Sequence, residues 1–297
     1  FATGLRQSCA QIGDGGGLAG LAANGYSTSV HAPSSQHRVA LPMPIIAVAN
    51  QKGGVGKTAT VANLGAALAE TGRKVLLVDL DPQTNLSLSL GVDPSQDSSH
   101  RPTAYQVLMD GGTSAQEVLL DTPWPGLSLL PGDENLSAAQ VQLATATHKN
   151  VRLRNKLQRL AGFDYVLIDT PPSLGFLTLN ALTAADWVLI PVQASFLALH
   201  GLRQLIQTLQ AVREHSNPGL RVGGVLLTMY DTRTLHAHQV QERVVEYFGD
   251  AVFSAVVHRS VVFDYATVAA EPMVYHRPNH PCAQTYRDLA QEVIRRA

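Results

Sequence analysis

Residues 45–58 read IIAVANQKGGVGKT, a short apolar run that passes through a glycine-rich loop to a lysine and a threonine. The apolar run has no polar alternation, which is typical of a strand buried on both faces. Its glycines let backbone N–H groups turn inward around phosphate oxygens, and the helical pattern that follows offers a helix N-terminus to the same anion. Strand, glycine loop and helix in this order predict a phosphate-binding site rather than an incidental turn.

Individual side chains of this loop have distinct chemistry. Lys57 can reach the outer phosphates of a nucleotide, and the Thr58 hydroxyl can bind Mg²⁺. The usual pattern has Gly where Gln51 stands, and this chain carries a second lysine, Lys52. The residues expected to contact the nucleotide are Gly53, Gly54, Val55, Gly56, Lys57, Thr58 and Ala59.

The strand pattern recurs along the chain. Residues 75–78, 165–168, 187–192 and 222–227 are short apolar runs, each followed by helical periodicity. This alternation predicts an α/β fold that is P-loop NTPase-like, with a mostly parallel twisted sheet and helices on both faces. Ligands of such sheets bind beyond the carboxyl ends of the strands. Residues 91–135, rich in Pro, Gly, Ser and Asp, predict a surface insertion with short helices.

Composition narrows the function classes. With 45% hydrophobic and 15% charged residues, the chain of 297 residues is typical of a compact soluble protein. A formal net charge of −1 excludes a globally basic nucleic-acid binder, so any DNA contact needs a local patch. No apolar run approaches the roughly 18 residues of a membrane span. The only cysteines, Cys9 and Cys282, lie far apart, which excludes a paired-cysteine metal site and indicates a reducing cytoplasm.

Residues 1–42 differ from the rest of the chain. They are rich in Gly, Ala and Ser and show neither helical nor strand periodicity, so we expect a disordered extension. They begin with Phe1 and lack the basic start and apolar core of a signal peptide. Because a strand pattern begins directly after Met43, we hypothesise that Met43 initiates the native protein and that residues 43–297 form one domain.

Two acidic motifs follow the glycine loop in order. VLLVDLDPQTN places Asp79 and Asp81 at the end of the second predicted strand, and YVLIDTPPSLG places Asp169 at the end of a later one. Together with the leading lysine of KGGVGKT, these motifs resemble the deviant Walker A ATPases of the ParA and MinD class. The similarity covers essentially all of 43–297, and the whole set is closer to the ParA or Soj type of chromosome and plasmid partition proteins than to MinD.

The resemblance implies an ATP hydrolase with ATP and Mg²⁺ as cofactors. Lys52 is expected to reach across a dimer to the nucleotide of the other subunit, where a second cation stabilises the charge that hydrolysis builds. Asp81 is expected to orient the attacking water. With Lys57 on the phosphates, these three side chains are the candidate catalytic residues.

The candidate metal ligands are Thr58, Asp79 and Asp169. The resemblance places the two carboxylates where acids bind Mg²⁺, either directly or through its other ligands. An acid at the end of a strand can instead cap a helix or form a turn, and this alternative is strongest for Asp79.

The resemblance also implies an ATP-dependent homodimer in the bacterial cytoplasm. Such a dimer binds nucleoid DNA without sequence preference, uses no membrane, and is stimulated to hydrolyse ATP by a centromere-binding protein of the ParB type. Arg233, in DTRT, matches a DNA-contacting arginine of the family. The second such arginine, in the family's PRNVR segment, is replaced by Val262 in the sequence HRSVV. Arg259, Arg277 and Arg203 could compensate.

Other functions fit the sequence less well. A MinD-like membrane switch would need a basic amphipathic C-terminal helix, whereas residues 286–294 predict a helix docked on the core, with Asp288 and Glu292 on its polar side. An iron–sulfur carrier would need paired cysteines, and a small-molecule kinase or ligase would not explain Lys52. The remaining alternative is an ATPase that positions another protein or membrane cargo without DNA, with 258–262 serving another surface.

Overall fold

A computed structural model describes residues 43–93, 101–195 and 198–297, so the extension expected at 1–42 lies outside the described residues. The described strands form an eight-stranded sheet in the order β3-β4-β2-β5-β1-β6-β7-β8. Their bounds are β1 (Ile45–Val48), β2 (Val75–Asp79), β3 (Leu120–Asp121), β4 (Leu127–Leu130), β5 (Tyr165–Asp169), β6 (Trp187–Gln193), β7 (Arg221–Tyr230) and β8 (Val252–His258).

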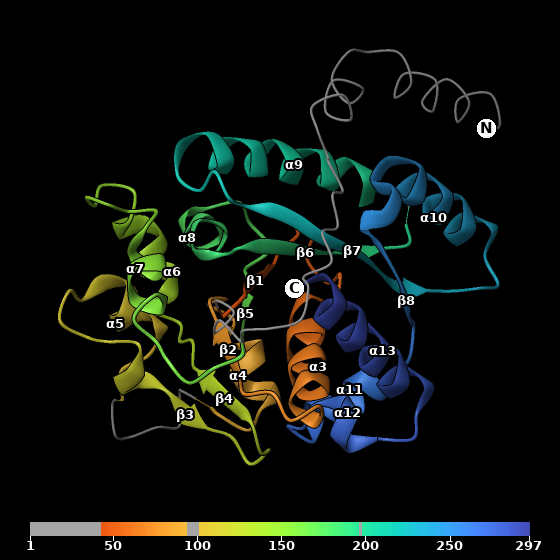
Figure 1. The fold of residues 1–297 in the computed structure, drawn as a ribbon, viewed down its shortest axis with the longest axis horizontal. Coiled ribbons are helices and arrows are strands. Elements are labelled where there is room, and N and C mark those ends of the chain that lie inside the picture. The colour runs from red at the N-terminus through yellow and green to blue at the C-terminus, as the bar shows by residue number, and fades with distance from the viewer. Residues whose placement is uncertain (1–42, 94–100, 196–197) are drawn as a thin grey trace, which may run out of the picture. The chain divides into compact units, whose positions relative to one another are not determined.

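Helices cover both faces of this sheet (Figure 1), as the apolar strands predict. Figure 1 shows α9 and α10 along one face and α3 and α13 along the other. The α-helices are α3 (Lys57–Glu70), α4 (Asn85–Ser89), α5 (Ala104–Met109), α6 (Leu136–Gln142), α7 (Arg152–Leu157), α8 (Phe176–Ala184), α9 (Ala198–His215), α10 (Leu235–Phe248), α11 (Val262–Val268), α12 (Met273–His276) and α13 (Pro281–Arg296). Short 3₁₀ turns occupy Gln116–Val118 and Gly249–Ala251. Among the described helices, none is both long and apolar enough to cross a bilayer.

The register of the central strands brings the motifs together. All strand pairs are parallel except β3 with β4, which confirms the prediction of a mostly parallel sheet. Val48 of β1 lies opposite Asp169 of β5, and Asp79 of β2 lies opposite the same Asp169. The glycine loop and both acidic motifs therefore meet at one carboxyl edge, at the centre of the sheet.

Three strands, β3, β4 and β8, were not predicted from the sequence. Residues 91–135 were expected to form only a surface insertion with short helices, but β4 pairs with β2 inside the sheet and buries three leucines. A four-residue strand between Gly126 and Pro131 is too short to stand out among turn-forming residues. The strand β8 alternates between buried and exposed positions, because it lies at the edge of the sheet, and so lacks the continuous apolar run used to recognise the others.

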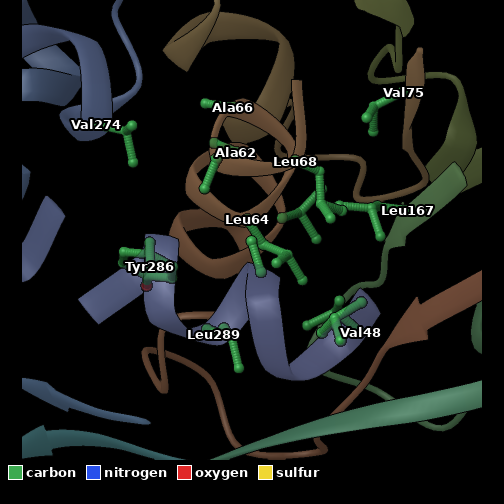
Figure 2. Packing of buried hydrophobic residues seen from close by; sticks show 14 of the residues in the cluster. Val48, Ala62, Leu64, Ala66, Leu68, Val75, Leu167, Val274, Tyr286 and Leu289 are labelled. Carbon is green, nitrogen blue, oxygen red and sulfur yellow. The ribbon is translucent and has the colours of Figure 1, made fainter. Parts of the chain in front are cut away.

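The core forms where α3 packs against the sheet and against α13. Figure 2 shows α3 beside α13, which contributes Tyr286 and Leu289, and beside the strands that carry Val48, Val75 and Leu167. A Cβ on Gly65 would lie 2.6 Å from Leu77 Cδ2, so a larger residue would displace the Leu77 side chain where α3 packs on β2. This packing fixes the N-terminal end of α3, and with it the glycine loop.

The C-terminal helix is docked on the core, as its spacing predicts. Tyr286, Leu289 and Val293 are buried, and Arg287 binds Glu70 of α3 through a 2.7 Å hydrogen bond from Nε. Glu292 was wrongly expected on the polar side. It is buried, because its carboxylate accepts hydrogen bonds from the N–H groups of residues 254 and 255 in the edge strand β8.

Candidate nucleotide-binding site

The glycine loop has the backbone conformation that its composition predicts. Gly54 and Gly56 have φ angles of +68° and +84°, in the left-handed region that side chains with a Cβ rarely adopt. Gly56 is the N-cap of α3 and offers no capping side chain, and the first turn of α3 holds no acid. The N–H groups of this first turn are therefore left for an anionic ligand.

The loop lysine is held inside the site. Lys57 is 6% exposed, and its Nζ lies 3.4 Å from the carbonyl oxygen of Lys52. Burial lowers the pKa of Lys57, while the negative charges of Asp169 and Asp81 act in the opposite direction. A buried ammonium with one long hydrogen bond retains donors for phosphate oxygens.

The third motif supplies a buried carboxylate beside the loop. The Thr58 hydroxyl donates a 2.6 Å hydrogen bond to Asp169 Oδ2, and Asp169 Oδ1 has no hydrogen-bond partner although it is buried. Burial, followed by the repulsion of Asp79, raises the pKa of Asp169 to about 8. A carboxylate that costs this much free energy to ionise is suited to a site where a cation binds.

A magnesium ion fits this pair of ligands. Among the described residues, no group of three or more His, Cys, Asp or Glu side chains is arranged to hold a metal. Mg²⁺ does not require such a cage, since it is commonly held by one or two protein oxygens, by water and by the phosphates of a nucleotide. Thr58 and the unpartnered oxygen of Asp169 are the protein groups that match this mode.

The carboxylate of Asp79 is already engaged by its own chain. It accepts hydrogen bonds from the N–H of Asp81 at 3.1 Å, and from the N–H and hydroxyl of Ser87 at 2.9 and 2.7 Å. Burial raises the pKa of Asp79 to about 6. These contacts, which fasten α4 to the end of β2, match the structural alternative of turn formation more closely than direct metal binding.

Asp81 has a different position although it is only two residues away. It is 7% exposed and lines a cleft of about 730 Å³ together with Gly53, Gly54 and Thr58. Its Oδ1 accepts a 3.0 Å hydrogen bond from the N–H of Gln83, which fixes the carboxylate at the cleft wall. A carboxylate acceptor in this place can orient a water molecule beside bound phosphate.

The second lysine is held at the end of β6. Lys52 Nζ donates to Gln193 Oε1 at 2.7 Å and to Ser195 Oγ at 3.1 Å. The N–H of Lys52 donates to Asn50 Oδ1 at 3.0 Å. Sequence reasoning missed these partners, although the carboxyl end of a strand predicted at 187–192 was a signal for them.

The neighbouring strand also contacts the loop. Thr228 of β7 is buried, and its hydroxyl donates a 2.9 Å hydrogen bond to the carbonyl oxygen of Val55. Ala59 lines the cleft from the first turn of α3. The far wall, which sequence reasoning did not anticipate, comes from the segment around α11 and α12 and includes Phe263, Thr267 and Met273.

The two candidate DNA-contacting arginines follow neighbouring strands. Tyr230 of β7 pairs with His258 of β8, so Arg233 and Arg259 lie at the same edge of the sheet. The Arg233 side chain is 86% exposed and forms a two-point ion pair with Asp231, at 2.9 Å from Nε and 2.7 Å from Nη2. Hydrogen bonds from Arg233 hold the pKa of Asp231 well below its usual range, and the charge of Arg259 adds to this effect.

The position of the missing family arginine is apolar and partly buried. Val262 packs against the hydrophobic core at the start of α11, so the local backbone directs this side chain inward. Arg259 lines the nucleotide cleft. Arg259, which was expected to compensate for this loss, thus lies at the rim of the cleft rather than on α11.

Comparisons with known proteins show the family to which this chain is similar. Residues 43–222 match the family model described as an AAA domain. The chain is 44% identical to the chromosome partitioning protein ParA of Caulobacter vibrioides, over 86% of this chain and 95% of that protein. It is 43% identical to the sporulation initiation inhibitor protein Soj of Bacillus subtilis, over 84% of this chain and 97% of that protein.

Solved structures support the fold. A cobyrinic acid a,c-diamide synthase from Mycobacterium smegmatis, solved with an ATP analogue and magnesium, superposes with a TM-score of 0.74 at 39% identity, covering 85% of this chain and 95% of that one. The P-loop NTPase-like fold predicted from the sequence is thereby confirmed. Because relatives above 40% identity are matched over nearly their whole length, this chain belongs to the ParA/Soj family of chromosome-partitioning ATPases.

Proposed function

We propose that this chain is a dimerising switch that closes on ATP, binds DNA without sequence preference, hydrolyses ATP slowly and drives chromosome or plasmid partition. Its partner would be a centromere-binding protein of the ParB type, and it would be located on the nucleoid in the bacterial cytoplasm.

The observation that carries the proposal is the pair of lysines on one loop. Lys57 is buried in its own site, whereas the Lys52 ammonium binds two neutral side chains among the residues that the structure describes. One lysine is enough to serve the phosphates of its own protomer. The second remains for the nucleotide of a second copy.

ATP and Mg²⁺ are the cofactors that these residues fit. Thr58 and Asp169 would hold Mg²⁺, which neutralises charge on the phosphates when bound. The backbone of the glycine loop and Lys57 would orient the phosphates, and Asp81 would hold the attacking water. The M. smegmatis relative, solved with an ATP analogue and magnesium, supports this assignment.

DNA contact is proposed at the edge formed by the ends of β7 and β8. Arg233 is exposed there, and Arg259 lies beside it on the rim of the nucleotide cleft. Arg233 and Arg259 both act on one acid, Asp231, so these three side chains carry a net positive charge at this edge. A dimer would double the number of phosphate contacts, so DNA affinity would report the nucleotide state.

The test is DNA binding in three nucleotide states. Binding of purified protein to random-sequence duplex DNA is measured with an ATP analogue, with ADP and without nucleotide, for wild type and Arg233→Ala. Binding that needs the ATP analogue, weakens with salt and is reduced in the variant supports the proposal. An ATP-dependent dimer that binds no DNA in any state would contradict the DNA role and leave the ATPase standing.

One observation favours the alternative of a cargo other than DNA. On and beside α11, the side chains of Val261, Tyr265 and Val268 are 65%, 62% and 88% exposed and lie at helical spacing. An apolar stripe beside the position of the missing arginine suits a protein cargo better than phosphate. The loss of DNA binding described above would favour this second function.

A further inference from the structure

Lys52 is linked to β6 and to the residues that follow it through both its side chain and its backbone. Its side chain binds Gln193 and Ser195, with donor–acceptor distances of 2.7 and 3.1 Å. Its N–H binds Asn50 Oδ1, and the Asn50 amide in turn donates a 2.7 Å hydrogen bond to the carbonyl oxygen of Pro191. Backbone and ammonium of this lysine are thus both directed towards their own protomer.

Within the described part of the chain, both acceptors of the Lys52 ammonium are uncharged. A carboxamide oxygen and a hydroxyl oxygen form weaker hydrogen bonds with an ammonium than an anionic phosphate oxygen does. The half-buried position of Lys52 leaves the ammonium able to move away from them. The contact is therefore strong enough to order the side chain in a single protomer, and weak enough to be exchanged for phosphate.

We propose that Gln193 and Ser195 are positioning residues that retain the Lys52 ammonium in its own protomer until a second copy presents its nucleotide. The inference rests on the proposed function, in which Lys52 acts across the dimer. The retained lysine raises the protein concentration at which ATP closes the dimer, because two hydrogen bonds must break before closure.

Substitutions at Gln193 should act in opposite directions. Gln193→Met keeps the length of the side chain and removes the amide oxygen, so the ammonium is released and ATP-dependent dimers form at a roughly 3- to 10-fold lower protein concentration. Ser195→Ala should act in the same direction with a smaller effect. Gln193→Glu creates an ion pair with Lys52, so closure needs a roughly 10-fold higher concentration. Residues with only a structural role would weaken the dimer whichever way they were changed.

The experiment is sedimentation velocity over a concentration series with a non-hydrolysable ATP analogue and Mg²⁺. Wild type, Lys52→Ala and the three variants are compared, with Gln158→Glu, at the exposed end of α7, as the control for added negative charge. Nucleotide affinity at monomeric concentrations and melting temperature should stay close to wild type in every Gln193 and Ser195 variant.

Each outcome separates the two proposals. Opposite shifts for Gln193→Met and Gln193→Glu support the retention of Lys52. The decisive case is a wild type that dimerises with nucleotide and a Lys52→Ala variant that does not. In that case, shifts in the same direction for both Gln193 variants, or no shifts, would overturn the retention of Lys52. A wild type that stays monomeric with nucleotide at every concentration would overturn the proposed function, and the inference with it.

Discussion

The Thr58 hydroxyl donates a 2.6 Å hydrogen bond to one carboxylate oxygen of Asp169, while the other oxygen is buried without a partner. The first turn of α3 and the end of β5 are joined at this point, although the two residues are 111 positions apart. Ionisation of this buried carboxyl group, next to the glycine loop, is unfavourable in the empty site. A site with this property is destabilised when empty and gains from a bound cation.

The first prediction concerns the stability of the nucleotide-free protein. Because the pKa of Asp169 is raised to about 8, the folded state retains a proton that the unfolded state loses near its ordinary pKa. The free energy of unfolding should therefore fall as pH rises between about 4 and 8. Asp169→Asn should flatten this fall and raise the melting temperature at pH 8 by a few degrees. Equal slopes for wild type and variant in thermal unfolding from pH 5 to pH 8 would refute the assignment.

The second prediction concerns Mg²⁺. Thr58→Val removes the hydroxyl and keeps the branched shape, so the gain in nucleotide affinity on adding Mg²⁺ should be lost, whereas Thr58→Ser should keep most of it. The measurement is fluorescent-nucleotide binding with Mg²⁺ and with EDTA. A Thr58→Val protein that still responds fully to Mg²⁺ would show that the hydroxyl does not bind the metal.

The third prediction separates binding from hydrolysis. Lys57→Ala should lower nucleotide affinity by roughly 100-fold, because a charge-assisted contact to phosphate is lost. Asp81→Ala should retain ATP and accumulate the closed dimer, since only the orientation of water is affected. Nucleotide binding measures the affinity, gel filtration measures the closed dimer, and phosphate release measures hydrolysis. Hydrolysis by Asp81→Ala at the wild-type rate would show that the water is held by another group.

The fourth prediction uses the ion pair between Asp231 and Arg233. Arg233→Ala should weaken DNA binding of the nucleotide-bound dimer and reduce the salt slope by about two, one for each protomer. Asp231→Asn should strengthen binding by roughly 2- to 5-fold, because it releases the guanidinium from its carboxylate. Fluorescence anisotropy over a salt series checks both. Identical slopes for wild type and Arg233→Ala would place the DNA surface elsewhere.

The central strands and the glycine loop could be predicted because their signals are local. A continuous apolar run, a left-handed glycine and the acid that follows a strand are each encoded within a few residues. The structural alternative was predicted to be strongest for Asp79, but the contact that distinguishes Asp79 from Asp81 could not be predicted. It depends on Ser87, which reaches back from α4 to one carboxylate and leaves the other at the cleft.

Long-range contacts account for what the sequence left open. The partners of Lys52 lie 141 and 143 positions away, and only the order of the strands brings them to the loop. The burial of Glu292 also depends on a long-range contact, because its carboxylate accepts hydrogen bonds from β8. That edge strand carries no continuous apolar run and was not predicted. Val262 was identified as a departure from the family pattern, but its packing into the core required the position of α11.

The most direct test of the central claim mixes two inactive variants. Lys52→Ala retains Asp81, and Asp81→Ala retains Lys52, so a mixed dimer holds one complete site only if Lys52 acts on the nucleotide of the other protomer. ATP hydrolysis by an equimolar mixture should recover above the rate of either variant alone, up to about a quarter of the wild-type rate if half of the dimers are mixed, since each mixed dimer holds one complete site. A mixture as inactive as its two components, with mixed dimers present, would mean that Lys52 serves its own nucleotide and would contradict the account.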